Sequence, residues 1–182
     1  MKILAVSGSA RKGGNTEILI REALRGAGAD GVEINILPDM DVRGCRGCRA
    51  CRSEKGKGCK VKDEMQGLYK EIKEADALVL GSPIYYGELT GQMKCFMDRW
   101  YALRDKDRNL RIASGKKVLF IITQGADGED RYKAAAERVT KVLKSYEMQP
   151  VVIVAPGVEA KGEVREKAGL MEKAFAAGRT LA

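Results

Sequence analysis

Short apolar runs alternate along this chain with longer segments in which apolar residues recur at steps of three and four. The short runs are typical of buried strands, and they lie at residues 3–6, 32–37, 77–80, 118–122 and 151–155. Each longer segment carries one apolar stripe, as expected of a helix that covers a sheet. The stripes are Thr16/Ile20/Leu24/Ala27, Met65/Leu68/Tyr69/Ile72/Ala75, Leu89/Met93/Phe96/Met97/Trp100, Ala135/Val139/Val142/Tyr146 and Val164/Ala168/Met171/Phe175.

This alternation predicts an α/β fold in which helices cover both faces of a five-stranded parallel sheet, because each parallel crossover needs a helix. We expect the doubly wound, flavodoxin-like strand order 2-1-3-4-5. The 182 residues suffice for one domain, 1–182, and no internal repeat or linker divides them. Ligands of such folds bind outside the carboxyl ends of the strands. The loops after strands one, three and four should therefore meet at that edge, together with a long insert after strand two.

The first of these loops, residues 7–16, has the composition of a phosphate-binding turn. It reads SGSARKGGNT and leads into a helix, whose first amide groups and positive dipole end favour an anion. The side chains that can complete a phosphate site are Ser7, Ser9, Arg11, Asn15 and Thr16. The loop matches neither a Walker A motif nor the G-x-G-x-x-G pattern of dinucleotide sites. A polar turn with Asn15 as the helix cap is the alternative.

Two further loops at the same edge suit a flat ring system. The segment SPIYYG at residues 82–87 places two adjacent tyrosines between a proline and a glycine, and tyrosine offers π surface together with a hydroxyl group. Packing of at least one of these tyrosines into the core is the alternative. The segment TQGADG at residues 123–128 offers amide and backbone groups for the polar edge of a flat cofactor. Its candidate binding residues are Thr123, Gln124 and Gly125.

Four cysteines, Cys45, Cys48, Cys51 and Cys59, are the most specific chemical signal in the chain. A C-x2-C-x2-C run wraps an iron-sulfur cluster naturally, with the fourth ligand supplied from elsewhere, and Cys59 is the candidate for that ligand. The spacing therefore favours a [4Fe–4S] cluster. Zinc is one alternative, although zinc sites built from cysteines usually pair two C-x2-C units, and redox-active or inert thiols are another. Cys95 has no cysteine nearby in sequence, which favours a small buried residue.

The insert that holds these cysteines, at about residues 43–62, also holds nearly all of the net charge. It contains eight basic side chains and one acidic side chain, a net +7 out of the chain's formal +8. Positive charge near a cluster stabilises its negative centre, and it can attract an acidic electron carrier. A nucleic-acid surface and a solvated basic loop are the alternatives. The insert contains no aromatic residue, which argues against binding of single-stranded nucleic acid.

The chain has no histidine, which excludes Ser-His-Asp and Cys-His catalysis, zinc sites that contain histidine, and Rieske ligation. No residue stands out as an acid–base catalyst. The longest apolar runs are far shorter than the ~20 residues of a membrane helix, and the first apolar segment is too short for a signal peptide. We therefore expect a cytoplasmic protein, in which clustered cysteines hold a metal or carry out redox chemistry.

Taken together, these motifs resemble the iron-sulfur flavoproteins, a branch of the flavodoxin-like NAD(P)H-dependent FMN reductases found in anaerobic prokaryotes. The resemblance covers most of the chain. It rests on GSARKGGNT, the four-cysteine insert, KDEM, EADALVLGSPIYYGELTGQMKCFMDR and the Gly157-Val158 turn. It implies FMN, with the phosphate at Ser7, Ser9, Arg11, Asn15 and Thr16. It places the isoalloxazine ring against Pro83, Ile84, Tyr85, Tyr86 and Gly87.

The same resemblance implies that Cys45, Cys48, Cys51 and Cys59 ligate the cluster, although the seven-residue gap before Cys59 is at the long end of the family's pattern. It implies a homodimer or homotetramer with the flavin near a subunit interface. The implied function is electron transfer from a ferredoxin-like one-electron donor, or from NAD(P)H, through the cluster and FMN to a small-molecule acceptor. One alternative is a cluster-free NAD(P)H-dependent FMN or quinone reductase whose cysteines bind zinc or nothing. Another is a metal-nucleated basic module that binds nucleic acid or a protein.

Overall fold

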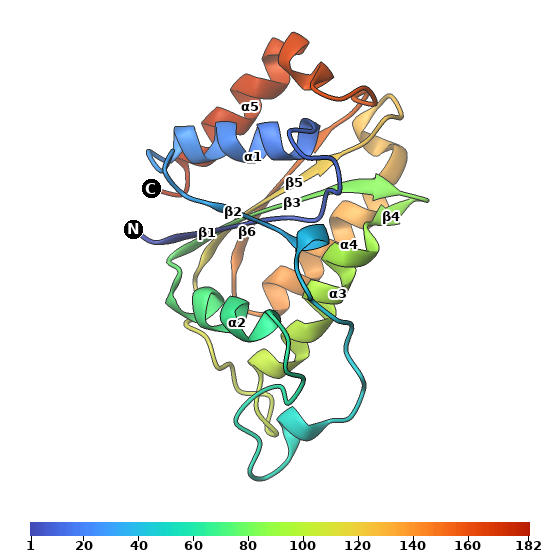
Figure 1. The fold of residues 1–182 in the computed structure, drawn as a ribbon. Helices are drawn as coiled ribbons and strands as arrows, with labels where there is room; N and C mark the ends of the chain where they lie inside the picture. Colours follow the sequence, from blue (N-terminus) through green and yellow to red (C-terminus); the bar gives the residue numbers. More distant parts are fainter.

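A parallel sheet of five strands forms the centre of the computed structural model, which describes residues 1–182 (Figure 1). These strands are β1 (Ile3–Ser7), β2 (Ile34–Ile36), β3 (Ala77–Tyr85), β5 (Lys117–Thr123) and β6 (Gln149–Ala155). Their order across the sheet is β2-β1-β3-β5-β6. Counted along the chain this is the predicted order 2-1-3-4-5, so the doubly wound α/β topology is confirmed.

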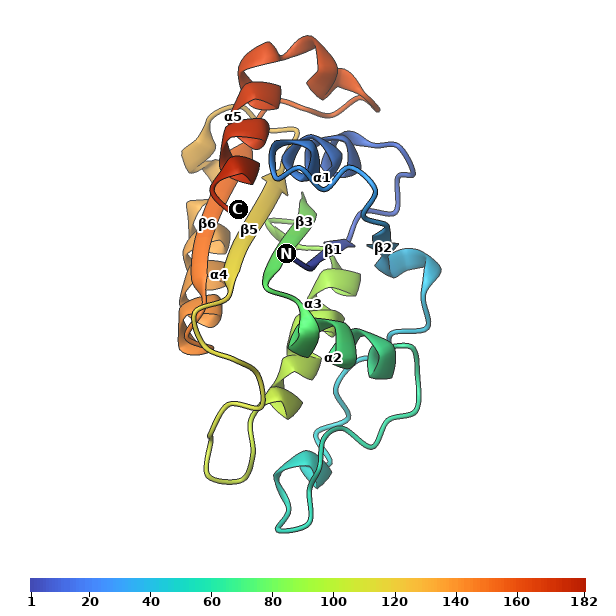
Figure 2. The same ribbon diagram turned by 90° about the vertical axis from the view of Figure 1, so that its left-hand side faces the viewer.

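Helices cover both faces of the sheet (Figures 1 and 2). One face is covered by α1 (Asn15–Gly26) and α5 (Ala168–Arg179), and the other by α2 (Met65–Glu74), α3 (Gly91–Arg99) and α4 (Lys133–Ser145). Each face has its own apolar core, because successive strand residues point to opposite faces. In β3, for example, Leu78 packs toward α2, α3 and α4, whereas Val79 packs toward α1 and α5. None of the helices is both long and apolar enough to cross a membrane.

The two edge strands are shorter or more exposed than the apolar pattern predicts. β2 is three residues long, because the next residues form a 3₁₀ turn, η1 (Leu37–Asp39), that contains Pro38. At the other edge, Val151 of β6 is 42% exposed. On α4, which packs against β6, Val142 of the predicted stripe is likewise exposed, and Leu143 takes the buried position. An edge strand has a neighbour on one side alone, so fewer of its apolar side chains are covered.

The central strand β3 is longer than predicted. It continues past Leu80 to Tyr85 and pairs with β5 as far as Pro83. β1 ends opposite Gly81, so the backbone of β3 beyond this point has an open side, where a proline is tolerated. A short strand, β4 (Glu88–Leu89), then pairs antiparallel with the end of β3. The segment predicted as a loop is therefore a β-hairpin.

The last helix packs on the α1 side through part of the predicted stripe, because Met171 packs against that core and the Phe175 ring lies under the Arg25 guanidinium, and also through small residues outside the stripe. Its buried residues include Ala177 and Gly178, whereas Ala168 is exposed. Val164 is buried, but it lies before the helix in a 3₁₀ turn, η5 (Glu163–Glu166). The two helices cross so closely that a Cβ on Gly178 would lie 1.9 Å from the carbonyl oxygen of Ala23. Close backbone approach requires small residues at the crossing, and the predicted stripe did not include them.

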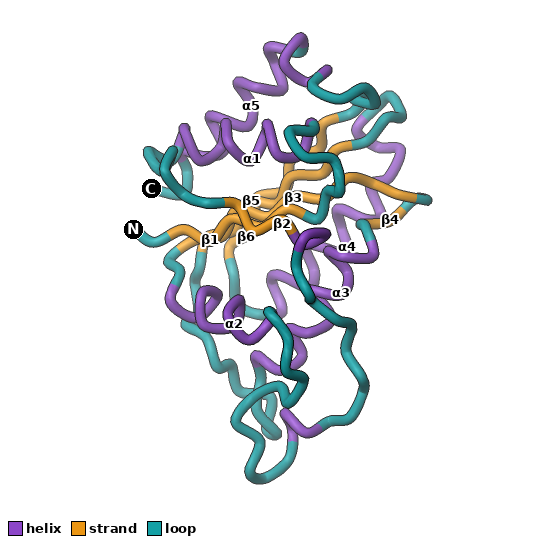
Figure 3. The backbone as a smooth tube through the Cα atoms, viewed as in Figure 1, coloured by secondary structure: helices purple, strands orange, loops and turns teal.

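The insert after β2 does not lie at the carboxyl edge of the sheet, so the sequence-based placement was wrong. The segment that leads from β2 into the insert, which we call its first arm, contains Met40 and Val42. These two side chains pack against the apolar core on the α3 side, so the chain runs along that helix. Its tip contacts η3 (Trp100–Leu103), at the far end of α3. Figure 3 shows the insert as a loop beyond the α2–α3 layer, with the short turn η2 (Ala50–Arg52) within it.

Candidate functional site

The loop after β1 is held in shape by its own hydroxyl groups. Ser7 Oγ accepts a hydrogen bond from the Ser9 amide, and Ser9 Oγ accepts one from the Arg11 amide, both at 3.2 Å. The Gly13 amide donates to a carboxylate oxygen of Glu17 at 2.8 Å. The loop leads to α1, whose first amide groups have no partner within the helix. It therefore brings hydroxyl groups and amide donors together at the positive end of the α1 dipole.

Two of the predicted phosphate ligands also belong to the internal framework. Asn15 Nδ2 donates to the carbonyl oxygens of Val158 at 3.2 Å and Ala160 at 2.9 Å. Its Oδ1 accepts from a backbone amide of η5. The hydroxyl groups of Thr16 and Thr123 are 2.7 Å apart. Asn15 thus fixes the loop after β6 against the start of α1, and Thr16 ties α1 to the end of β5.

The hairpin that follows the centre of β3 turns at Tyr86 and Gly87. Tyr86 and Gly87 have φ angles of +51° and +84°, both positive as in a type I′ turn. Tyr85 is 45% exposed, and Tyr86 is fully exposed. Neither tyrosine packs into the core, so the alternative of structural packing does not hold. The hairpin presents both rings at the surface.

The loops after β1, β3, β5 and β6 surround one cavity of about 330 Å³. Ten of the predicted cofactor-binding residues line it: Ser9, Arg11, Asn15, Thr16, Pro83, Ile84, Tyr85, Thr123, Gln124 and Gly125. Ser7 is buried beneath the loop, and Tyr86 and Gly87 form the hairpin tip outside the cavity. The prediction missed Val158 and Glu159, which come from the loop after β6. The Gly157-Val158 motif was the signal that could have found them.

Gln124, which lines this cavity, has a buried acceptor without a partner. Its Nε2 donates to the carbonyl oxygens of Ala126 at 3.1 Å and Gly128 at 2.8 Å, which fixes the orientation of the amide. Its Oε1 is buried and has no hydrogen-bond partner. A buried acceptor without a partner is costly, and such groups are rare in folded proteins. Gln124 Oε1 is therefore placed to accept a hydrogen bond from an N–H group of a ligand.

All four cysteines of the insert line a second cavity, of about 270 Å³. Cys45 and Cys48 are exposed, Cys51 is buried and Cys59 is half-buried. Burial raises the pKa of the Cys51 thiol, and the neighbouring Cys59 raises it further. No group of three or more His, Cys, Asp or Glu side chains is arranged to hold a single metal ion. All four cysteines nevertheless line the same cavity.

The two cavities share no residue and lie toward opposite ends of α3. This helix begins beside the hairpin, where the Thr90 hydroxyl accepts from the Met93 amide at 3.2 Å. It ends at Arg99, which lines the cysteine cavity. A helix of this length spans about 13 Å. Cys95 lies between the two ends, half-buried, and a Cβ on Gly44 would be 3.6 Å from its sulfur.

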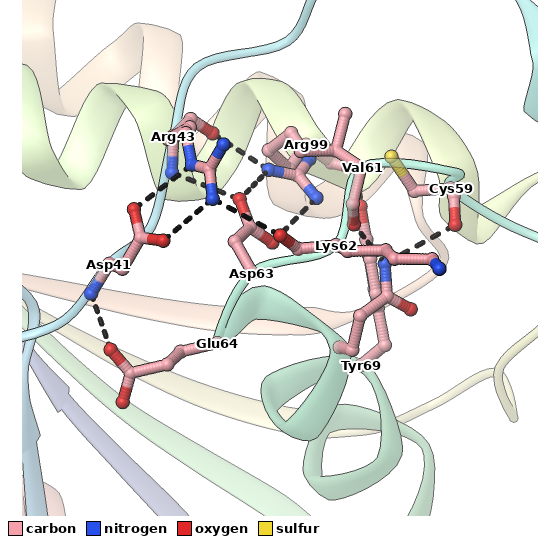
Figure 4. Close-up of polar contacts among 10 residues, drawn as sticks. Asp41, Arg43, Cys59, Val61, Lys62, Asp63, Glu64, Tyr69 and Arg99 are labelled. Atoms are coloured by element: carbon pink, nitrogen blue, oxygen red, sulfur yellow. Dashed lines mark hydrogen bonds and ion pairs between the residues drawn. The ribbon is translucent and has the colours of Figure 1, made fainter.

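Three arginines fasten the insert to the rest of the chain. The guanidinium of Arg52 stacks over the ring of Tyr101, with its Cζ 4.2 Å from the ring centroid. Arg111 Nη2 donates to the carbonyl oxygen of Cys51 at 3.2 Å. Arg99 bonds to both arms of the insert at its base (Figure 4). Spacing along the sequence gave no sign of these contacts, because the partners are far apart in the chain.

Comparison with known proteins gives consistent matches. The family model described as NADPH-dependent FMN reductase matches residues 1–159. An iron-sulfur flavoprotein of Methanocaldococcus jannaschii is 42% identical over 106 residues, which cover 57% of this chain and 54% of that protein. A second iron-sulfur flavoprotein of the same organism is 31% identical over 153 residues, which cover 83% of this chain and 75% of that protein.

A solved structure supports the fold. The NAD(P)H:quinone oxidoreductase from Methanothermobacter marburgensis aligns with a TM-score of 0.78 at 17% identity, covering 100% of this chain and 96% of that one. The fold match and the family model together define an α/β protein of flavodoxin-like architecture in the FMN reductase class. The chain belongs to the NADPH-dependent FMN reductase family, in the group of the iron-sulfur flavoproteins. It spans little more than half the length, 54%, of the first relative named above.

FMN fits the cavity that contains Gln124, because the ring system of the flavin carries an N–H donor at its polar edge and Gln124 Oε1 lacks one. We expect Gln124→Met to weaken FMN binding about tenfold, as one lost hydrogen bond to a buried group predicts. Titration of the apoprotein with FMN, followed by flavin fluorescence, measures this affinity. Gln149→Met, on an exposed position of β6, is the matched control. Equal affinities of the two variants would contradict the assignment.

Proposed function

We propose that this chain binds FMN in the cavity at the carboxyl edge of the sheet and holds a [4Fe–4S] cluster in the cysteine cavity. The phosphate would lie at the start of α1, the ring against the hairpin and its polar edge at the loop after β5. The proposed cluster ligands are Cys45, Cys48, Cys51 and Cys59. The observation that carries the proposal is that all four thiols line one cavity, in a chain whose relatives are named iron-sulfur flavoproteins.

The two groups together suit electron transfer. An iron-sulfur cluster supplies one-electron transfer, and a flavin accepts or releases one or two electrons. We propose a ferredoxin-like one-electron donor or NAD(P)H as the source of electrons, and a small molecule as the acceptor. The part of the protein is to hold both groups and to set their surroundings. We also propose a homodimer or homotetramer, in which a neighbouring subunit would cover the exposed rings of Tyr85 and Tyr86.

Anaerobic assays with a single donor test this function. Reduced ferredoxin and NAD(P)H are each offered alone, and reduction of the bound flavin is followed by its absorbance. We expect reduced ferredoxin to reduce the flavin of the wild-type protein and not that of Cys59→Ala. Reduction by NAD(P)H in both proteins, with no response to ferredoxin in either, would instead support a cluster-free FMN reductase.

A basic cavity beside Cys59 is the proposed docking site for an acidic electron carrier. This cavity, of about 530 Å³, lies between the insert and α2, and Cys59 also lines the cysteine cavity. Four lysines line it: Lys57, Lys60, Lys70 and Lys73. Glu74 is the one acidic residue in its wall. A concave surface with charge of mainly one sign raises the association rate of a partner with the opposite charge.

Reversing charge in this cavity should slow the acidic donor. We expect the double variant Lys70→Glu/Lys73→Glu to reduce the rate of reduction by ferredoxin at low salt about tenfold, because electrostatic steering is lost. Stopped-flow measurements at several salt concentrations check this, and the wild-type rate should fall as salt rises. Lys141→Glu/Lys144→Glu on α4 makes the same change in net charge at exposed positions elsewhere. Equal rates for the two double variants would exclude docking at this cavity.

A further inference from the structure

Hydrogen bonds between the two arms close the base of the insert (Figure 4). The Arg43 amide donates to Asp63 Oδ2 at 3.1 Å, and Arg43 Nη2 donates to the carbonyl oxygen of Lys62 at 3.2 Å. The Glu64 amide donates to the carbonyl oxygen of Asp41 at 3.0 Å. We call these five residues, Asp41, Arg43, Lys62, Asp63 and Glu64, the insert base. All four cysteines of the insert lie between its two arms.

Arg99 joins the two arms of the insert base from α3. Its Nη1 and Nη2 donate to Asp63 Oδ2 at 2.6 Å and Asp63 Oδ1 at 3.1 Å, and Nη1 also donates to the carbonyl oxygen of Arg43 at 2.8 Å. Both charged side chains are fully buried. Burial disfavours both charges, but the hydrogen bonds between them outweigh it, so the pKa of Asp63 is lowered and that of Arg99 is raised. The pair is therefore charged throughout the physiological pH range.

One nitrogen atom of the Arg99 guanidinium makes no hydrogen bond. Its Nε is buried and has no hydrogen-bond partner, although buried donors almost always have one. Arg99 lines the cysteine cavity, where the four thiols are the other potential partners. Its backbone is also fixed, because the Tyr69 hydroxyl donates to the carbonyl oxygen of Arg99 at 2.7 Å. A rigidly held arginine whose Nε has no partner thus forms part of the wall of this cavity.

We propose that Arg99 is a positioning residue for the iron-sulfur cluster. Arg99 closes the insert base through its Nη groups, and it donates its Nε–H to a sulfur atom in the cysteine cavity. This inference rests on the cluster of the proposed function. Closure of the base lowers the conformational freedom of the loop that carries the ligands. A hydrogen bond to a cluster sulfur stabilises the reduced form and raises the reduction potential.

Arg99→Lys keeps the charge but removes both the Nε–H group and the bidentate Nη contacts, so its effect on the potential is compared with that of the variant below, which removes the Nη contacts and the charge together. We expect the variant to lower the reduction potential of the cluster by the equivalent of a tenfold change in the reduction equilibrium, about 59 mV for one electron. A redox titration followed by electron paramagnetic resonance measures the potential, with iron and sulfide content determined on the same samples. Arg104→Lys is the control, because Arg104 also packs over a tyrosine ring and bonds to backbone oxygens but lies outside the cavity.

A second variant tests the closure of the base without leaving a buried charge unpaired. Arg99→Met/Asp63→Leu replaces the ion pair with apolar side chains, a change that folded proteins usually tolerate. In iron-free protein we expect the buried thiol of Cys51 to be alkylated at least tenfold faster in this variant than in the wild type, and iron to be lost faster from the reconstituted variant. The exposed thiol of Cys45 serves as the internal reference for the alkylation rate.

The two measurements separate this inference from the proposed function. If the wild type contains iron and sulfide but both variants keep its potential, alkylation rate and iron retention, the inference is wrong and the proposed function stands. A wild type without iron and sulfide would overturn the proposed function and the role of Nε together. The alkylation rates would still show whether Arg99 holds the insert base closed.

Discussion

Cys51→Ala protein is expected to lose nearly all of its iron and sulfide and to keep its FMN. Cys51 is the buried thiol of the cysteine cavity, and a [4Fe–4S] cluster is held by four thiolates, so removal of this ligand leaves one iron exposed to solvent. FMN should remain, because the cavity at the carboxyl edge of the sheet and the cysteine cavity share no residue. Iron, acid-labile sulfide and flavin are quantified per chain after anaerobic purification.

Two further cysteine variants identify the fourth ligand. Cys59→Ala should lose iron as Cys51→Ala does, because Cys59 lines the same cavity. Cys95→Ala should keep it, because Cys95 lies on α3 outside that cavity. Loss of iron from Cys95→Ala but not from Cys59→Ala would make Cys95 the fourth ligand. Loss of FMN together with iron in any of these variants would show that the insert helps to build the flavin site.

Gly178→Ala is expected to destabilise the fold by about 3 kcal/mol, which lowers the Tm by about 6 to 12 °C for a chain of this size. The added Cβ would lie 1.9 Å from the carbonyl oxygen of Ala23, so the two helices must move apart. The same crossing is tight from the other side, where a Cβ on Gly26 would lie 2.1 Å from the carbonyl oxygen of Phe175. Thermal unfolding followed by circular dichroism measures the change.

Gly169→Ala is the matched control on the same helix. A Cβ at this position meets no atom within 4 Å. Alanine also favours a helix over glycine by up to about 1 kcal/mol, so the variant should be as stable as the wild type or slightly more stable. If Gly178→Ala unfolded at the same temperature as Gly169→Ala, the close α1–α5 crossing would be wrong.

The order of the sheet could be predicted because parallel strands and covering helices leave separate periodic signals. The elements that deviate do so where a tertiary contact outweighs that periodicity. The α5 stripe missed Ala177 and Gly178 because the close crossing with α1 requires small residues at those positions. The length of β3 was underestimated because Pro83 indicated the end of the strand. Beyond Gly81, β3 has no neighbour on the β1 side, so a proline is tolerated there while the strand still pairs with β5.

The residues around the cavity at the carboxyl edge of the sheet were largely predictable, because topology brings the loops after β1, β3 and β5 to that edge. The position of the cysteine insert was not. Its first arm is anchored by Met40 and Val42 to the core beside α3, which carries the cysteines away from that edge. The Asp63–Arg99 pair was also missed, because its partners are 36 residues apart and no spacing links them.

The central claim, that one chain holds both FMN and a [4Fe–4S] cluster, is tested most directly by the cofactor content of protein purified without oxygen. Iron, acid-labile sulfide, zinc and FMN are quantified per chain, and absorption spectra are recorded before and after dithionite. We predict about four iron, about four sulfide and about one FMN per chain, with a broad sulfide-to-iron absorption that dithionite bleaches. FMN with zinc or no metal, and no bleachable shoulder beneath the flavin bands, would contradict the claim.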